Sequence, residues 1–237
     1  MSKFISQKVN NWLKTAQTGL YPLSCFICQQ AGQHGLDLCP ACRRELSPIE
    51  LGCSICGIEL STANAVCGRC LKSPPAFNRV EAPYRYQGSA RFLIQQLKFQ
   101  SKYCCARIIG SLMASHLKPL NKTPDALMAV PLHIKRLSER GFNQSELIAQ
   151  HLQQQLKVPL RNQPLTRLRN TAKQSSLHAD DRRNNIHQAF SYQASDKINS
   201  IAIIDDVVTT GATADELAKT LKQAGVEKVE IWAFARA

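Results

Sequence analysis

The sequence predicts an α/β protein in which helices flank a parallel sheet, preceded by a small zinc-ribbon module. Two observations predict it. Short apolar strands alternate with helical patterns across residues 80–237, as in parallel sheets. Eight of the ten cysteines form four Cys-x-x-C pairs near the amino end, as in zinc ribbons. We therefore expect a helical segment over residues 1–24, a double zinc ribbon over residues 25–73 and the sheet domain over residues 80–237.

The amino-terminal segment predicts neither export nor membrane insertion. Its first residues lack the apolar core of a signal peptide, and no stretch of the chain approaches the ~20 apolar residues that span a bilayer. We expect a cytoplasmic protein without membrane contact. The segment's apolar residues are spaced for one short amphipathic helix, to which we assign no function.

The cysteine pairs repeat at a fixed interval. Ten residues separate the two pairs within residues 25–42, and ten separate the two pairs within residues 53–70, so the module is a duplicated unit. Four thiolates suit a tetrahedral zinc ion, which stabilises a segment too small for a hydrophobic core. We expect two structural zinc ions, and their candidate ligands are Cys25, Cys28, Cys39, Cys42, Cys53, Cys56, Cys67 and Cys70.

Other interpretations of the cysteines have less support. A disulfide framework requires an oxidising compartment, against which the missing signal peptide argues. Redox chemistry needs only one Cys-x-x-C pair on a βαβ scaffold. The spacing leaves the zinc pairing open, either sequential within each repeat or cross-braced between alternate pairs. Cys104 and Cys105 stand apart in a helical pattern, and we expect them to be packed in the interior.

The elements of the second domain follow a Pro-Pro pair at residues 74–75 that ends the zinc module. Apolar spacing then predicts alternating strands and helices. The expected strands are residues 82–86, 127–130, 201–204 and 229–234. The expected helices are residues 90–99, 105–117, 144–156 and 213–224. Residues 159–167 are predicted to be extended or irregular, and the polar stretch 169–189 to be a long functional loop.

The most informative stretch is residues 203–213. Asp205 and Asp206 end a buried strand, which is where ligands bind in open α/β sheets. The carboxylates accept hydrogen bonds from vicinal hydroxyls. The turn after them opens a helix, and backbone N–H groups beside hydroxyls and a glycine suit a phosphate. We expect a ribose 5-phosphate site, with the phosphate held by Thr209, Thr210, Gly211, Ala212 and Thr213.

Residues 131–144 follow another strand end, so their cations are expected over the same ligand face. Lys135, Arg136 and Arg140 form a candidate anion clamp, because guanidinium groups bind phosphate oxygens in pairs and neutralise a departing diphosphate. The alternative is a solvated basic loop. Residues 84–183 hold 17 Lys or Arg against 5 Asp or Glu, which favours an anionic ligand or nucleic acid, although a soluble basic surface explains the same excess.

Residues 203–213 closely resemble the phosphoribosyl pyrophosphate (PRPP) motif of type I phosphoribosyltransferases. The resemblance implies that the acidic dyad holds the ribose hydroxyls and that the Thr/Gly turn holds the 5-phosphate, with magnesium bound mostly through PRPP oxygens and water. It also implies a flexible loop that closes over the sugar and excludes water. The candidate residues of that loop are Lys173, Gln174, Arg182 and Arg183.

Nearly the whole chain resembles the ComF/GntX family of competence-associated, type I phosphoribosyltransferase-like proteins. The resemblance rests on the tandem ribbons, the PRPP-like segment, residues 85–88, 97–99 and 140–144, and the region around Gln174. It implies the phosphoribosyltransferase-like fold and a role in natural transformation, the handling of incoming single-stranded DNA in the cytoplasm. A helicase or recombination protein is the implied protein partner.

Two functions agree with these residues. One is an enzyme that transfers the phosphoribosyl group of PRPP to an acceptor and releases pyrophosphate. The other is a non-catalytic single-stranded DNA-binding or adaptor protein that uses the same site for a nucleic acid or a regulatory phosphate. Aromatic residues interspersed with cations suit base stacking, although they suit a core equally well. These aromatic residues are Tyr84, Tyr86, Phe92, Phe99 and Tyr103.

Overall fold

The computed structural model describes residues 23–63, 65–120, 123–162, 165–168, 189–193 and 197–237. The chain divides into two compact units, Met1–Glu45 and Leu46–Ala237. The first contains the first cysteine repeat and the short helix α2 (Pro40–Arg44). The second contains the other repeat, with helix α3 (Gly68–Lys72), and the sheet domain. Most of the predicted helical segment at residues 1–24 lies outside the described residues.

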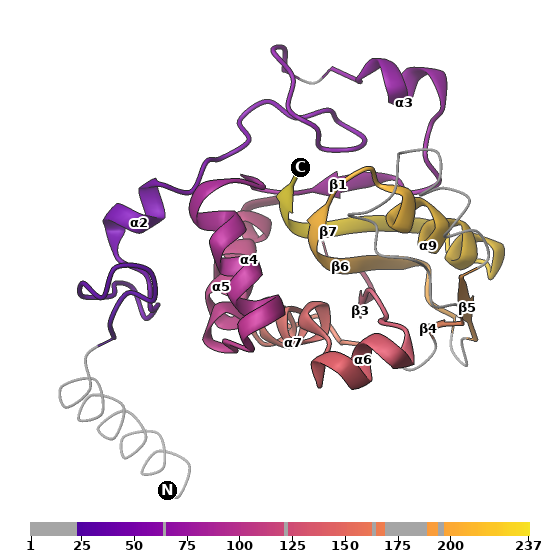
Figure 1. Ribbon diagram of the computed structural model, residues 1–237. Helices are drawn as coiled ribbons and strands as arrows, with labels where there is room; N and C mark the ends of the chain where they lie inside the picture. The colour runs from indigo at the N-terminus through magenta and orange to yellow at the C-terminus, as the bar shows by residue number, and fades with distance from the viewer. Residues whose placement is uncertain (1–22, 64, 121–122, 163–164, 169–188, 194–196) are drawn as a thin grey trace, which may run out of the picture. The chain divides into compact units, whose positions relative to one another are not determined.

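A parallel sheet forms the centre of the second unit, as predicted (Figure 1). Its order is β1-β7-β6-β3, and β2 also pairs with β7. The two central strands are almost wholly buried because their apolar side chains are covered on both faces. The strands are β1 (Arg79–Glu81), β2 (Tyr84–Arg85), β3 (Ala126–Ala129), β6 (Ser200–Val208) and β7 (Lys228–Arg236).

Helices cover both faces of this sheet. Helices α4 (Gly88–Gln100), α5 (Cys104–Leu117) and α7 (Gln144–Leu156) lie on one face, and α9 (Ala212–Gln223) lies on the other (Figure 1). The helices bury apolar side chains at helical spacing, as Leu93, Ile94 and Leu97 do in α4. The remaining elements are η1 (Lys118–Leu120), α6 (Ile134–Arg140) and an antiparallel pair of β4 (Leu165–Arg167) and β5 (Phe190–Tyr192).

The structure differs from the predicted elements mainly at their ends. The strand expected at residues 201–204 continues to Val208, because β7 keeps pairing with it as far as Arg236. The strand expected at residues 82–86 is limited to the two residues of β2, and β1, at residues 79–81 just before it, was not predicted. Residues 134–140, for which no helix was predicted, form helix α6. Its apolar spacing is weak, and none of its side chains is buried.

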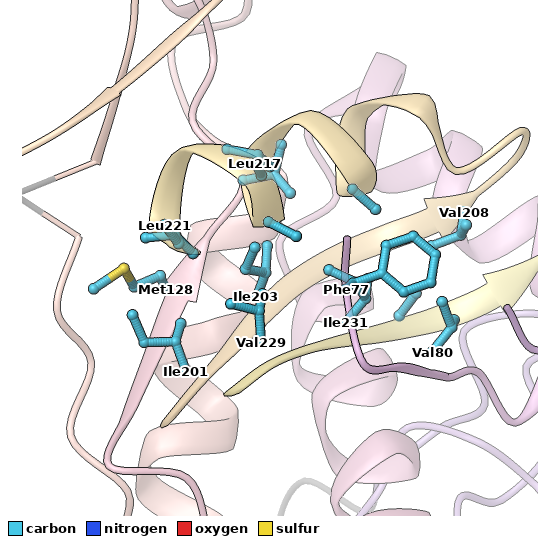
Figure 2. Packing of buried hydrophobic residues seen from close by; sticks show 14 of the residues in the cluster. Phe77, Val80, Met128, Ile201, Ile203, Val208, Leu217, Leu221, Val229 and Ile231 are labelled. Carbon is cyan, nitrogen blue, oxygen red and sulfur yellow. The ribbon is translucent and has the colours of Figure 1, made fainter. Parts of the chain in front are cut away.

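A hydrophobic core lies between the sheet and α9 (Figure 2). Ile203 and Ile231 of the sheet pack in one cluster with Leu217 and Leu221 of α9. Cys53, Cys56 and Cys70 of the second repeat belong to the same buried cluster. Residues 46–73 therefore fold onto the sheet domain as part of one core. The limits predicted for the zinc ribbon, residues 25–73, and for the sheet domain, residues 80–237, remain a prediction.

Candidate functional site

The cysteines form two clusters with the geometry of a zinc ion's ligands. We call them the first ribbon cluster (Cys25, Cys28, Cys39 and Cys42) and the second ribbon cluster (Cys53, Cys56, Cys67 and Cys70). Within each, the Sγ atoms lie within 4.8 Å of one another. The Sγ atoms of Cys28 and Cys39 are 3.5 Å apart, and those of Cys56 and Cys67 are 3.7 Å apart. Tetrahedral zinc with Zn–S bonds of about 2.3 Å separates its sulfurs by roughly 3.8 Å.

This grouping answers the question that the spacing left open. The ligands are paired sequentially within each repeat, and the cross-braced alternative does not occur. All ten cysteines are within the described residues, and all are free thiols, so no disulfide framework is present. Four thiolates complete the coordination of a zinc ion and leave no position for a substrate, so both sites are structural.

Backbone amides favour the thiolate form that binds zinc. Burial raises the pKa of Cys25, but amide donors, led by that of Cys39, outweigh it and lower the pKa to about 6. Cys53 has the same environment, with burial again opposed by amides that lower its pKa to about 6. The amide of Cys67 donates to Cys53 Sγ at 3.3 Å. The duplicated sequence therefore surrounds the first cysteine of each repeat with the same kind of backbone amide donors, which stabilise its thiolate.

The acidic dyad lies on β6, one residue facing a hollow and the other enclosed by protein. Asp206 is 1% exposed, forms an ion pair with Lys98 of α4 and accepts a hydrogen bond from Gln144 Nε2 at 3.2 Å. Asp205 accepts hydrogen bonds from Ser145 Oγ at 3.1 Å and from the amide of Asp206 at 2.9 Å. Asp205 is therefore the carboxylate that a ligand can reach.

Asp205 differs from an ordinary carboxylic acid in its proton affinity. Burial raises its pKa, the charge of Asp206 raises it further, and Lys98 opposes both, with the result that the pKa is about 7. A carboxyl group with this pKa exchanges a proton near neutral pH. Perturbed acids of this kind are concentrated at functional sites.

The start of α7 is fixed in place by Asn143. Its side-chain Oδ1 accepts a hydrogen bond from the amide of Ser145 at 3.0 Å and thereby caps the helix. Its Nδ2 donates to the carbonyl of Val130, just after β3, at 3.0 Å. Asn143 thus connects a strand end to the helix turn that presents Gln144 and Ser145 to the dyad.

The turn after β6 forms a small hollow that is open to solvent. We call residues 209–211 the phosphate loop. Gly211 has φ +83°, a left-handed conformation that glycine adopts without strain, and it precedes the first turn of α9. Thr210 contributes through its hydroxyl, which accepts from the amide of Ala212 at 3.3 Å. The hollow is lined by Asp205, Val207, Val208, Thr209, Gly211, Ala212, Thr213 and Ala214.

The three candidate clamp residues lie on α6. Arg140 donates to Gln144 Oε1, and its guanidinium lies over the ring of Phe99 with 6.0 Å between them. Burial lowers the pKa of Arg140, and Asp206 partly compensates. The charge of Arg136 repels that of Arg140 and lowers the pKa of Arg140 further. Lys135 is exposed in the first turn, where its backbone amide donates a hydrogen bond to Nδ1 of His133. Arg140 is therefore the clamp residue connected to the dyad.

Sequence reasoning did not connect several residues with the dyad. Lys98 was expected only among the cations interspersed with the aromatic residues, and Ser145 was given no role. Both contact the dyad only through the fold, Lys98 at Asp206 and Ser145 at Asp205. Arg167, at the end of β4, lies 5.5 Å over the ring of Phe190. Burial lowers its pKa to about 10, repulsion by Arg136 adds to this, and Asp205 opposes it. Arg167 is thus a further cation near the dyad.

The candidate flexible-loop residues Lys173, Gln174, Arg182 and Arg183 lie outside the described residues. In the parts of the chain that the structure does describe, no helix combines the length and apolar character required to cross a membrane.

The sequence resembles known proteins over most of its length. Residues 16–71 match the double zinc ribbon domain family. Competence protein F of Haemophilus influenzae is 34% identical over 208 residues, which are 84% of this chain and 90% of that protein. DNA utilization protein YhgH of Escherichia coli K12 is 33% identical over 223 residues, 91% of this chain and 97% of that protein. Competence protein ComFC of Bacillus subtilis is 26% identical over 233 residues, 87% of this chain and 92% of that protein.

Proposed function

Because the chain belongs to the ComF/GntX family, which includes competence protein F and DNA utilization protein YhgH, we propose that it binds PRPP beside Asp205 and acts in the uptake and utilisation of DNA in the cytoplasm. The observation that supports PRPP binding is a single hollow lined by both Asp205 and the first residues of α9. A carboxylate favours hydrogen-bond donors such as hydroxyl groups, whereas a helix N-terminus favours anions such as phosphate. A ribose 5-phosphate carries hydroxyl groups and a phosphate.

The two ends of the hollow suit the two parts of such a ligand. The ionised carboxylate of Asp205 accepts hydrogen bonds from ribose hydroxyls. The 5-phosphate accepts hydrogen bonds from the N–H groups at the positive end of α9, with the hydroxyl groups of Thr209 and Thr213 beside it. Lys98 neutralises Asp206, so two adjacent acids do not repel the phosphate with their full charge.

The cations around the dyad suit the pyrophosphate end of PRPP. Arg140 is connected to Asp206 through Gln144, and Arg136 and Arg167 act on this cluster electrostatically. A magnesium ion keeps several waters and takes one or two carboxylates together with ligand phosphates. Asp205 supplies one carboxylate, so magnesium arriving with PRPP fits this donor set. The reaction class that this arrangement supports is substitution at the anomeric carbon with pyrophosphate leaving.

Calorimetric titration of the zinc-loaded protein with Mg-PRPP tests the binding site. Asp205→Asn should weaken PRPP binding by about 10-fold to 100-fold, the value of a hydrogen bond to a charged acceptor. Asp125→Asn is the matched control, because Asp125 accepts from the amides of Asn199 and Ser200 at the opposite end of β6. Equal affinities for the wild-type protein and Asp205→Asn would show that PRPP does not use this hollow.

Exposed aromatic side chains favour single-stranded DNA as a second ligand of the same region. Phe99 is 69% exposed and Tyr103 is 56% exposed, where the sequence alone left their placement open. Tyr103 meets the ring of Phe142 edge-on, with 5.0 Å between the centroids, and Phe99 lies against Arg140. Lys102 is exposed between them in the sequence. Rigid aromatic faces beside cations suit stacked bases and their phosphates. We call Phe99 and Tyr103 the aromatic ledge.

Fluorescence anisotropy with a labelled oligonucleotide tests the ledge. Replacing both ledge residues with alanine should weaken binding at least 10-fold, since each base–aromatic contact is worth about 1–3 kcal/mol. Leu71→Ala is the control, because Leu71 is an apolar side chain of similar exposure, 68%, on α3. An unchanged affinity in the double variant would refute the ledge as a DNA-binding surface.

A further inference from the structure

We propose that the second ribbon cluster supports the phosphate loop, with Arg236 and Arg69 as positioning residues, so that zinc in this cluster is required for binding of a phosphoribosyl ligand. The inference rests on the proposed function for its ligand. It assigns to one of the two zinc sites a role in the ligand site, beyond holding its own ribbon together.

Arg236 connects a zinc ligand to the phosphate loop. Its guanidinium is buried, and Nε donates to the carbonyl of Cys56 at 2.9 Å. From the same group, Nη1 donates to the carbonyl of Val208 at 3.1 Å and to that of Thr209. One rigid, planar side chain thereby fixes the distance between the ribbon and the end of β6.

Zinc also supplies Arg236 with a negative partner. The guanidinium of Arg236 is buried and contacts Cys56, one of the four zinc ligands. A zinc ion with four thiolates carries two net negative charges. A loaded second ribbon cluster therefore offsets part of the cost of burying this guanidinium.

A second arginine reaches the loop from the ribbon itself. Arg69 lies in α3, immediately before the zinc ligand Cys70, and its Nη1 donates to the carbonyl of Thr210 at 2.9 Å. The chain leaving the ribbon adds further contacts, since the amide of Ala76 donates to Asp215 in the first turn of α9 at 2.6 Å. The ring of Phe77 lies 3.9 Å from the position that a Cβ would occupy on Gly211.

These contacts determine which way the loop amides point. In a planar trans peptide, the carbonyl and the following N–H point in opposite directions. Holding three successive carbonyls, those of Val208, Thr209 and Thr210, toward the arginines directs the next three N–H groups away from them. Val208, Thr209 and Gly211 also line the hollow. The ribbon therefore orients donors that a phosphate requires.

The position of the ribbon depends in turn on zinc. Its segment is too short to hold Cys56 and Arg69 by a core of its own, so four thiolates around one ion fix their relative positions. Without the ion, the carbonyl of Cys56 and the guanidinium of Arg69 lose their fixed places. The phosphate loop then samples orientations in which its amides do not converge on a ligand.

The duplicated module provides a matched comparison. Cys53→Ser with Cys56→Ser removes the second zinc site, and Cys25→Ser with Cys28→Ser removes the first, which belongs to the other compact unit. Each variant should retain one zinc ion per chain by metal analysis. We expect PRPP affinity to fall at least 10-fold in the first variant and by less than 2-fold in the second. Equal affinity for PRPP in both variants would overturn the proposal.

Hydrogen exchange separates this inference from the proposed function. In ligand-free protein, amides of residues 208–215 should exchange faster when the second zinc site is lost and unchanged when the first is lost. If the wild-type protein fails to bind PRPP but shows this difference, the ligand assignment is wrong and the support of the loop stands. Unchanged exchange at residues 208–215 would refute the support itself.

Arg69 allows a test that leaves the fold and the zinc site in place. It is exposed, so Arg69→Ala should keep two zinc ions and the wild-type melting temperature, yet weaken PRPP about 3-fold to 10-fold. Arg69→Lys retains one donor and should recover part of the affinity. Arg43→Ala is the control, because Arg43 is an exposed arginine in α2 of the first ribbon. Wild-type affinity in Arg69→Ala would exclude Arg69 as a positioning residue.

Discussion

Asp205 and Asp206 are adjacent in the chain but differ in what surrounds them. Asp206 has a permanent cationic partner in Lys98, whereas Asp205 combines burial with the like charge of its neighbour and carries a raised pKa of about 7. The two acids therefore differ in what they can do. Asp206 connects α4 and α7 at the site, and Asp205 offers the proposed ligand a charge that depends on pH.

The raised pKa predicts that PRPP binding strengthens as the pH rises through about 7. Below that value Asp205 is mostly protonated and is a poorer acceptor for ribose hydroxyls; above it the carboxylate is present. We expect affinity to increase several-fold between pH 6 and pH 8. Asp205→Asn should lack this increase, which distinguishes it from ionisation of the ligand's own phosphate. Parallel pH profiles for the two proteins would contradict the assignment.

The same shift predicts a stability effect of opposite direction. The folded protein binds the Asp205 proton more tightly than the unfolded chain does, because the pKa of this carboxyl group rises from its ordinary value of 3.8 to about 7 on folding. The free energy of unfolding due to this group therefore falls as pH rises through that window. Urea unfolding at pH 5 and pH 8 should show a smaller decline in Asp205→Asn than in the wild-type protein. An equal decline in both would mean that the pKa of Asp205 is not raised in the folded protein.

Lys98 should matter for stability as well as for the ligand. Its side chain is 18% exposed and that of Asp206 is 2% exposed, so Lys98→Ala leaves a buried carboxylate without its cation. We expect a loss of about 3 kcal/mol in the free energy of unfolding. In Lys98→Ala with Asp206→Asn, the loss should be smaller than the sum of the single losses. Additive losses by urea denaturation would argue against a direct pair.

Among single residues, the sequence predicted those whose partners lie close to them in the chain. The eight thiolates repeat at fixed spacing, and the dyad adjoins its loop within 11 residues, so both could be found without a structure. Lys98 precedes Asp206 by more than 100 positions, and Ser145 precedes Asp205 by 60. Such contacts depend on how helices pack on a sheet, and no local pattern encodes them.

The turn between β6 and α9 depends on one glycine. A Cβ at Gly211 would have room, since its nearest neighbours, atoms of Phe77, are 3.9 Å away. Its φ of +83° is nevertheless costly for any other residue. Gly211→Ala should therefore lower the free energy of unfolding by about 1 kcal/mol and also weaken PRPP by tilting the loop amides.

Gly68→Ala provides the comparison for that substitution. Gly68 begins α3 and does not have a left-handed φ, and a Cβ added there would meet no atom within 4 Å. Alanine there should leave stability and affinity nearly unchanged. Chemical denaturation and PRPP titration of both variants test the difference. A wild-type affinity in Gly211→Ala would mean that the phosphate loop tolerates another backbone conformation.

Helices were predicted better than strand ends or short helices. Apolar residues at helical spacing placed residues 144–156 without error, because Asn143 caps the helix and its apolar face is continuous. The end of β6 was underestimated because two aspartates normally mark a loop. Here Ser145, Gln144 and Lys98 satisfy their carboxylates, so hydrogen bonding with β7 continues past them.

Over the whole molecule, the alternation of strands and helices predicted the fold class. It did not predict which ribbon packs on the sheet domain. The duplication suggests two equal ribbons, yet the structure groups the second ribbon with the sheet domain and the first with the other unit. Buried Cys56 and Arg236 are 180 residues apart in the sequence. The spacing of residues therefore cannot predict the hydrogen bond from the Arg236 guanidinium to the Cys56 carbonyl. Equivalent sequences therefore acquire different tasks through what they pack against.

The net charge of +13 adds a long-range attraction for anions, and its consequence for DNA can be measured by salt dependence. The logarithm of oligonucleotide affinity should fall linearly with the logarithm of salt concentration, by about 0.7 per phosphate contacted. Arg140 adjoins both the aromatic ledge and the dyad, through Phe99 and Gln144. Arg140→Ala should therefore reduce the slope by about 0.7 and weaken both ligands.

The shared arginine also predicts that the two ligands compete. If Arg140 serves both, Mg-PRPP should displace a labelled oligonucleotide from the wild-type protein, and displacement should be lost in Asp205→Asn, whose ledge is intact. Arg44→Ala, a change at an exposed arginine of the first ribbon, should leave displacement unchanged. Simultaneous binding without mutual effect would place the DNA away from Arg140. Competition would instead mean that PRPP and DNA cannot occupy the site around Arg140 at the same time. Binding of PRPP would then release DNA.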